Sequence, residues 1–263
     1  MSRIEKLFRQ KPNRILNVYC TAGYPGTDDT VKLMNALQDN GAVMIELGMP
    51  YSDPLADGPV IQQSSAIALA NGMTIKKMFG QLKNLRQSPA EGGIGEGLPV
   101  LLMGYMNPVL QYGFEKFCAD AALAGIDGLI LPDLPMYEFE TEYGAIIKKH
   151  GLDFVFLVTP ETSDERIKRL DELSSGFLYA VSSSSTTGSN KNMTSVNAYL
   201  QKLQKLKLKN PLLVGFGIKD KESFNSACTH ANGAIIGTAF IKALENKGSL
   251  EETVKQFMDG ILR

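Results

Sequence analysis

The chain has 263 residues, with 27 basic and 28 acidic side chains and a formal net charge of −1. A chain of this length can bury a large core, and about 250 residues is the usual size of a (β/α)8 barrel. The balanced charge argues against nucleic acid or a membrane surface as a partner, so we expect neither.

Cysteine and histidine usage gives little sign of disulfides or metal chemistry. Cys20, Cys118 and Cys228 are widely spaced and form no CxxC pair, which predicts reduced thiols in a cytoplasmic protein. His150 and His230 lack metal-ligand spacing, so we expect no metal site. Apolar runs are too short to span a membrane, and the N-terminus is charged rather than signal-like.

Hydrophobic periodicity predicts strands and helices in regular alternation. Residues 4–8 have the spacing of a short amphipathic helix, which would cover the bottom of a barrel. Regular alternation implies parallel strands and right-handed crossovers, and eight units fit a closed barrel better than an open sheet. The predicted strands are residues 15–21, 43–48, 98–103, 127–131, 153–158, 177–181, 211–215 and 233–237.

Helical patterns follow each of these strands. We expect Thr27 to cap the helix after the first strand, and we expect a loop at residues 104–108. Two helices, 59–70 and 74–87, follow the second strand. The predicted fold is therefore a single (β/α)8 TIM barrel, with residues 1–263 as one domain, an extra N-terminal helix and an extra helix after strand 2. The remaining predicted helices are residues 114–123, 137–149, 164–173, 194–208 and 219–228, one that starts at Thr238, and a last one near the C-terminus.

The segment 46–59 combines three carboxylates with three prolines. A strand that ends on a carboxylate and enters a stiff loop can place acid/base groups at the mouth of a fold. Asp53 is more simply a turn or capping residue, but a glutamate at a strand end, such as Glu46, has no local capping role. A fixed Glu46 and a more mobile Asp57 would suit a reaction that moves protons between two atoms.

Glycines after the last two strands indicate a phosphate site. The segment 215–217 reads Gly-Phe-Gly, and Gly237 and Thr238 stand at a helix start, where free N–H groups favour an anion. Gly188, after strand six, could close the site from a third side. Such glycines also permit tight turns, but two pairs in the two expected loops favour phosphate.

The run Glu46-Leu47-Gly48-Met49-Pro50-Tyr51-Ser52-Asp53-Pro54-Leu55-Ala56-Asp57-Gly58 resembles the signature of the tryptophan synthase alpha subunit family. The resemblance covers essentially the whole chain and is strong again at residues 215–217 and 237–238. This family cleaves indole-3-glycerol phosphate to indole and D-glyceraldehyde 3-phosphate. The resemblance thus implies a retro-aldol lyase of L-tryptophan biosynthesis that uses no metal and no cofactor.

The resemblance also implies roles for individual residues. Glu46 would move protons at the indole C3 and the glycerol hydroxyl, and Asp57 would bind the indole N–H and stabilise the charge that develops there. Tyr179 would assist near Glu46. The residues implied to bind substrate form an indole slot (Tyr19, Met103 and Leu131), a lid (Thr187) and a phosphate site (Gly188, Phe216, Gly217, Gly237 and Thr238).

Members of the family pair with a beta subunit that holds pyridoxal phosphate, so an alpha2beta2 tetramer is expected. The segments at Asp53 and at residues 107–108 match regions that face this partner. The chain departs from the family pattern in two places. The loop 182–188 lacks an arginine and one glycine, and Tyr24 replaces an aspartate. These departures concern lid closure and a contact near the partner, not the chemistry.

Two other functions remain open from the sequence. Another phosphate-binding barrel, such as a sugar-phosphate isomerase or an indole-forming synthase, would share the glycine pairs. It would usually lack the acidic loop, and the synthase would carry a lysine on a strand, which no strand here offers. A non-catalytic activator of a beta subunit would be expected to have lost Glu46 or Asp57, and both are present.

Overall fold

A ring of parallel strands forms the centre of the molecule. The computed structural model describes residues 1–181, 193–215, 217–246 and 248–263. Its nine strand segments lie in the order β5-β4-β3-β2-β1-β9-β8-β7-β6, and every pair is parallel. Their bounds are β1 Ile15–Thr21, β2 Met44–Gly48, β3 Val100–Met103, β4 Gly128–Ile130, β5 Asp153–Phe154, β6 Leu157–Val158, β7 Leu178–Val181, β8 Leu212–Gly215 and β9 Gly233–Ile236.

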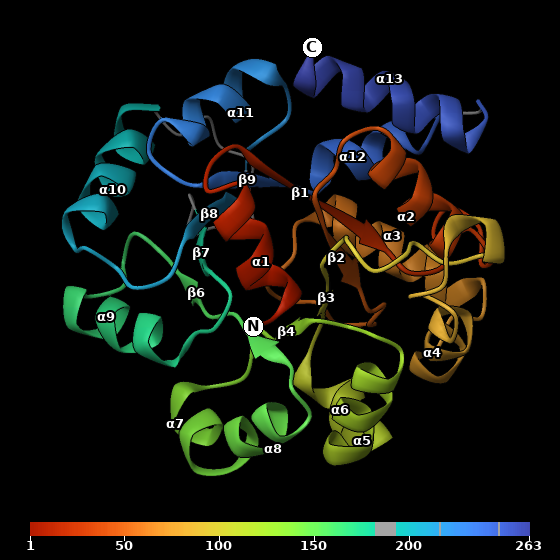
Figure 1. The fold of residues 1–263 in the computed structure, drawn as a ribbon, viewed down its shortest axis with the longest axis horizontal. Coiled ribbons are helices and arrows are strands. Elements are labelled where there is room, and N and C mark those ends of the chain that lie inside the picture. The colour runs from red at the N-terminus through yellow and green to blue at the C-terminus, as the bar shows by residue number, and fades with distance from the viewer. Residues whose placement is uncertain (182–192, 216, 247) are drawn as a thin grey trace.

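The two end segments, β5 and β6, are consecutive in the chain and separated by two residues. Between them, the Val155 N–H donates to the carbonyl of Leu129 on β4 at 3.1 Å. The carbonyl of Phe156 accepts from the Tyr179 N–H on β7 at 3.0 Å. Residues 153–158 therefore act as one interrupted strand that closes an eight-stranded barrel, as predicted (Figure 1).

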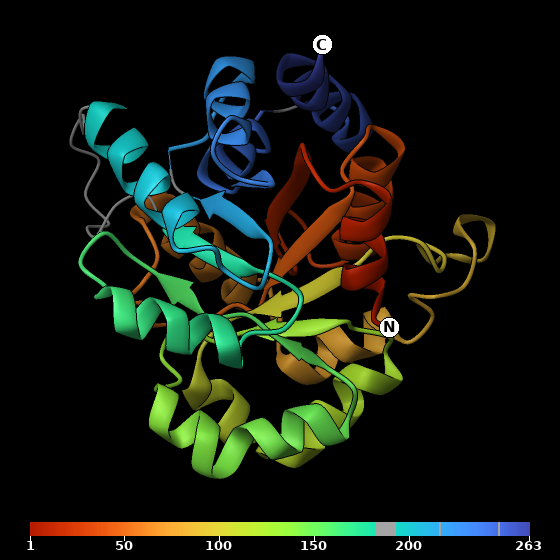
Figure 2. The same ribbon diagram turned by 60° about the vertical axis from the view of Figure 1, so that its left-hand side comes forward.

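Helices surround the barrel, and Figures 1 and 2 both show the last helix beside α2, which completes the ring. The helical elements are α1 Arg3–Gln10, α2 Thr30–Asp39, α3 Pro59–Ala70, α4 Ile75–Leu82, η1 Pro89–Glu91, α5 Met106–Tyr112, α6 Phe114–Leu123, α7 Met136–Glu138, η2 Phe139–Tyr143, α8 Gly144–Lys149, α9 Asp164–Leu173, α10 Met193–Lys205, α11 Lys221–Cys228, α12 Thr238–Ala243 and α13 Leu250–Leu262. Among the described residues, no helix is long and apolar enough to cross a membrane.

Helix boundaries differ from the sequence expectations at several places, most of all around α2, α4 and α5. Thr27 does not cap α2, since its hydroxyl donates to the carbonyl of Asn71 and the helix begins at Thr30. Helix α4 starts after the Thr74 cap as expected but ends at Leu82, where the chain enters a turn. The segment predicted as a loop at 104–108 includes the start of α5, because a proline in a first turn removes no intrahelical hydrogen bond.

Helix α1 lies across the end of the barrel where the strands begin (Figure 1). Ser2 and Glu5 form a capping box at its start, in which the side chain of each residue accepts from the backbone N–H of the other. Ile4 is fully buried, and the Phe8 ring lies 6.4 Å from the ring of Phe177, which precedes β7. The apolar stripe of α1 therefore covers the bottom of the barrel, as its periodicity predicted.

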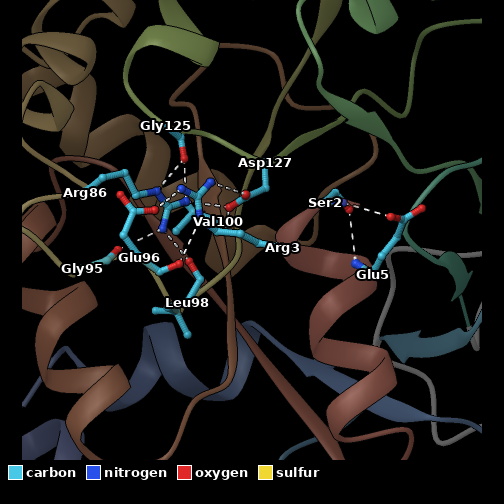
Figure 3. Close-up of polar contacts among 10 residues, drawn as sticks. All are labelled: Ser2, Arg3, Glu5, Arg86, Gly95, Glu96, Leu98, Val100, Gly125 and Asp127. Atoms are coloured by element: carbon cyan, nitrogen blue, oxygen red, sulfur yellow. Dashed lines mark hydrogen bonds and ion pairs between the residues drawn. The ribbon is translucent and has the colours of Figure 1, made fainter.

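An ion-pair cluster around the buried Asp127 joins elements at the same end of the barrel (Figure 3). Asp127 precedes β4, and its carboxylate pairs with Arg86 at 2.6 Å and with Arg3 at 3.0 Å. The N–H of Val100, on β3, also donates to this carboxylate at 2.8 Å, and Arg86 binds the carbonyl of Gly125. One carboxylate thus joins α1, the chain before β3 and the starts of two strands.

We expect Asp127→Asn to lower the free energy of unfolding by about 3 kcal/mol, because it leaves the mostly buried Arg86 without its counter-charge and removes one of the two carboxylates that pair with Arg3. Denaturant unfolding would measure this change. The matched control is Glu115→Gln, which breaks an exposed ion pair with Lys149 and should have little effect. Equal effects of the two substitutions would contradict a stabilising role for the cluster.

Candidate active site

A cavity lies at the opposite end of the barrel, where the strands end. In parallel barrels these ends meet at one face, so side chains from several strands converge there. Eight of the residues singled out from the sequence are brought together in this cavity. Its lining consists of Tyr19, Glu46, Asp57, Gly58, Ile61, Met103, Tyr179, Gly217, Ile218, Ile235, Gly237 and Thr238.

The other sequence-predicted residues are not in this group. Leu131 is buried directly after β4 but is not among the residues that line the cavity. Thr187, Gly188 and Phe216 lie outside the described residues. The described part of the site therefore contains both carboxylates, both tyrosines and part of the glycine-rich segments.

Glu46 lies on β2 opposite Tyr19 of β1 and is fully buried. Its Oε1 accepts a hydrogen bond from Nδ2 of Asn17 at 2.6 Å, whereas Oε2 has no described partner. Burial raises the pKa of the Glu46 carboxyl to about 8, and the hydrogen bond from Asn17 partly opposes this shift. Glu46 is therefore mostly protonated at neutral pH.

Asp57 lies on the loop between β2 and α3, and Tyr105 holds its side chain. The Tyr105 hydroxyl donates to Oδ2 of Asp57 at 2.8 Å and accepts from the Ala56 N–H at 3.0 Å. The Gln62 side chain binds the Asp57 carbonyl at 2.9 Å. Burial raises the pKa of Asp57 to about 6, again partly opposed by its hydrogen bond, so Asp57 is mostly ionised at pH 7.

The two carboxyls thus have different protonation states in one cavity between about pH 6 and pH 8. Two carboxyls whose surroundings separate their pKa values are the pattern expected of an acid and an electrostatic stabiliser. Glu46 can donate a proton, and Asp57 can stabilise a positive charge or bind an N–H donor.

Two tyrosines occupy the cavity because glycines leave room for their hydroxyls. A Cβ on Gly48 would lie 2.0 Å from the Tyr19 hydroxyl, and a Cβ on Gly215 would lie 2.3 Å from the Tyr179 hydroxyl. Burial raises the pKa of both tyrosines well above its usual range, so both remain neutral. They supply flat walls and hydroxyl groups without adding charge.

The glycine-rich side of the cavity has the features of an amide-lined anion site. Gly217 has φ +80°, which favours glycine, and nothing lies within 4 Å of where its Cβ would be. Gly237 and Thr238 lie at the start of α12, where N–H groups lack intrahelical partners. None of the described lining residues is a lysine or arginine. An anion here would be held by amides and a hydroxyl.

Sequence reasoning missed two polar residues of the site. Asn17 stands two residues before Tyr19 on β1, so period-two alternation places both side chains on the same face of the strand. Tyr105 stands two residues after the last residue of β3. These positions were weak signals, because their contacts with Glu46 and Asp57 depend on packing between elements. No group of three or more potential metal ligands occurs among the described residues.

A family model described as tryptophan synthase alpha chain matches residues 6–260. The tryptophan synthase alpha chain of Flavobacterium johnsoniae is 52% identical over 250 residues, which are 95% of this chain and 96% of that protein. The protein of the same name from Parabacteroides distasonis is 45% identical over 262 residues, 99% of each chain.

Solved structures show the same likeness. Tryptophan synthase subunit alpha from Legionella pneumophila has a TM-score of 0.88 at 34% identity, with 99% of this chain and 97% of that chain covered. The aminoacrylate-bound form of tryptophan synthase from M. tuberculosis gives a TM-score of 0.82 at 30% identity, with 99% and 100% covered.

The raised pKa of Glu46 predicts a pH-dependent cost in stability. At a pH between 4.5, the ordinary pKa of a glutamate, and about 8, its pKa in the folded protein, Glu46 holds a proton in the folded protein that it has lost in the unfolded chain. The free energy of unfolding therefore falls as pH rises through this window, and the penalty is complete above it. Because Glu46→Gln removes the penalty, we expect the variant to unfold at a higher temperature than the unsubstituted chain at about pH 9, with a smaller gain near pH 5. Calorimetry would measure both, and an equal gain at the two pH values would contradict the shift.

Proposed function

The chain belongs to the tryptophan synthase alpha chain family, and from this membership we propose how its cavity carries out the alpha reaction of tryptophan biosynthesis. That reaction is a carbon–carbon lyase step, which cleaves indole-3-glycerol phosphate to indole and D-glyceraldehyde 3-phosphate. The observation that carries the proposed mechanism is that two buried carboxyl groups, Glu46 and Asp57, line one cavity. Burial raises the pKa of Glu46 to about 8 and that of Asp57 to about 6, so the two groups suit different roles.

In the proposed mechanism, Glu46 first donates its proton to C3 of the indole ring. The ring nitrogen becomes electron-poor, and the Asp57 carboxylate accepts its N–H and stabilises the positive charge. The bond between C3 and the attached glycerol carbon then breaks, and its electron pair returns to the ring. The Glu46 carboxylate takes the proton of the hydroxyl on that carbon, whose oxygen becomes the aldehyde, so Glu46 ends as it began.

We assign the remaining lining residues to binding. Met103, Ile61 and the ring of Tyr19 provide apolar walls suited to a flat indole, with Tyr179 beside Glu46. The amides of Gly217 and Gly237 and the hydroxyl of Thr238 suit the phosphate at the other end. The substrate would thereby be held at both ends, with its scissile bond over Glu46.

We further propose that the chain assembles with a beta subunit as an alpha2beta2 tetramer. The acidic loop and α5 meet at the catalytic end of the barrel, where the Asn107 side chain donates to the Tyr51 hydroxyl at 3.0 Å. Both segments present apolar side chains to solvent, with Leu55 86% and Leu110 47% exposed. A partner seated there would contact the loop that carries Asp57.

We also propose that residues 1–263 act as one catalytic domain in the cytoplasm. One closed barrel holds the elements from both ends of the chain. The location is supported by the three cysteines, Cys20, Cys118 and Cys228, which are all free thiols.

Glu46→Gln should abolish indole release from indole-3-glycerol phosphate, because it keeps shape and removes the transferable proton. Indole would be quantified with and without a tryptophan synthase beta subunit, and the subunit should raise the rate of the unsubstituted chain. Glu115→Gln, a surface carboxylate change, serves as the control and should keep full turnover. Turnover by Glu46→Gln at the control rate would refute the assignment.

The value of kcat/KM should follow a bell-shaped pH profile with its maximum between about pH 6 and pH 8. Asp57 must be ionised, which requires a pH above about 6, and Glu46 must be protonated, which requires a pH below about 8. A phosphate group on the substrate also titrates near pH 6. The alkaline limb is therefore diagnostic, and activity that rises steadily through pH 9 would exclude Glu46 as the initial acid.

Thr238→Val should raise KM roughly tenfold or more with little change in kcat. The substitution keeps the side-chain shape but removes the threonine hydroxyl that would donate a hydrogen bond to the charged phosphate. Steady-state kinetics would separate the two constants. Thr229→Val removes an exposed hydroxyl after α11 and is the matched control. If both variants show the same KM, the phosphate binds elsewhere.

A further inference from the structure

Asn17 is a polar residue in the interior of the barrel. It lies on β1 between the buried apolar residues Leu16 and Val18, and its own side chain is fully buried. The strand registers set it opposite Met44 of β2 and Ile235 of β9. A buried amide among apolar neighbours lowers stability unless hydrogen bonds replace those it made with water. The contacts of Asn17 therefore bear directly on why an amide is present.

The described hydrogen bonding of the Asn17 side chain consists of one contact. Its Nδ2 donates to Oε1 of Glu46 at 2.6 Å, and its Oδ1 has no described partner. A residue with a purely structural role would be expected to satisfy more of its amide, since each unpaired buried polar atom costs stability. The amide instead makes its described bond to the group that exchanges protons.

We infer that Asn17 is a positioning residue for Glu46, whose amide holds Oε1 and leaves Oε2 as the oxygen that exchanges protons with the substrate. This inference rests on the proposed function, in which Glu46 is the acid/base group. Oε2 is the carboxyl oxygen that no described group engages. Fixing Oε1 limits rotation of the carboxyl and presents one oxygen to both the indole carbon and the hydroxyl.

An amide suits a group that changes its protonation state during turnover. The N–H of Asn17 can donate to Oε1 of Glu46 in both states, because Oε1 is a carbonyl oxygen when Oε2 is protonated and a carboxylate oxygen when it is not. An ammonium or guanidinium group would instead keep the carboxyl ionised. The amide therefore supports both halves of the proton transfer.

The other titratable groups around Glu46 do not replace this bond. Tyr19 and Cys20 on β1 and Tyr179 on β7 are neutral, since burial raises their pKa values. Asp57, on the loop after β2, is the ionised neighbour in the cavity and carries the same charge as a Glu46 carboxylate. The Asn17 amide is thus the described contact that favours the carboxylate form.

The test is the pH profile of Asn17→Leu, which keeps a similar volume and removes the donor. Loss of a bond that favours the carboxylate should move the alkaline limb of kcat/KM upward by about 1 to 2 pH units. It should also lower kcat roughly tenfold, since Glu46 becomes a weaker acid, with KM little changed. Asn17→Asp, of the same size, is the second variant and should move the limb upward too, because two carboxyls then share a proton.

The matched control is Thr30→Val. Thr30 is also buried, and its hydroxyl accepts from the Gly23 N–H and donates to Gln81, away from the cavity. This variant should lose thermal stability and keep the alkaline limb in place. The Glu46 titration should also be followed in the free protein, by 13C NMR of labelled glutamate carboxyls with Glu46→Gln to assign the signal. Its midpoint should rise in both Asn17 variants.

The outcomes separate this inference from the proposed function. An unmoved alkaline limb and an unmoved NMR midpoint in both Asn17 variants, with an inactive Glu46→Gln, would overturn the role of Asn17 alone. Full turnover by Glu46→Gln would overturn the proposed mechanism instead. A raised midpoint with lower kcat in the Asn17 variants, and no change in Thr30→Val, would establish the positioning role.

Discussion

Burial of one carboxyl group, that of Glu46, is the constraint on which the catalytic end of this barrel depends. The group is fully buried, and its described hydrogen-bond partner is a neutral amide rather than a cation. Burial without a counter-charge favours the protonated form, which makes Glu46 an acid at neutral pH. Asp57 is slightly more exposed and bound by a tyrosine hydroxyl, so it ionises first. The different roles proposed for Glu46 and Asp57 therefore follow from where each side chain lies.

The buried carboxyl groups at the two ends of the barrel have different partners, which are cations at one end and a neutral amide at the other. At the bottom, two arginines and a backbone N–H contact Asp127, and these contacts hold several elements together. At the top, Glu46 receives one described amide hydrogen bond and remains mostly protonated. Stability and chemistry are thus assigned to opposite ends, as in other barrels of this type. The loss of stability that comes from burying Glu46 without a counter-charge is offset by contacts elsewhere in the barrel, such as the ion pairs of Asp127.

The sequence predicted most of the fold because its signals are local. Apolar runs located all eight strands to within two residues, and the fifth differs only in being interrupted at residues 155–156. Helix α5 was missed because Pro108 resembles a loop residue, although a first turn tolerates it. In the candidate site, Glu46 and Asp57 were both singled out from one stretch of sequence, and both line the cavity. The Asn17 and Tyr105 contacts were not, because they depend on strand register and on packing across 29 and 48 residues of chain.

The protonation state of Glu46 also affects the number of negative charges in the cavity when substrate is bound. The described lining has no lysine or arginine, so neutral amides and a hydroxyl would face the substrate phosphate. With Asp57 ionised, a bound phosphate would be the second anion in a low-dielectric space, and an ionised Glu46 would be the third. In the proposed mechanism, each added anion would raise the pKa of Glu46 further, so substrate binding itself would keep the acid protonated until its proton moves to the ring. That transfer would create a carboxylate and a positive ring together, beside Asp57, and the Asn17 amide would then favour the new carboxylate.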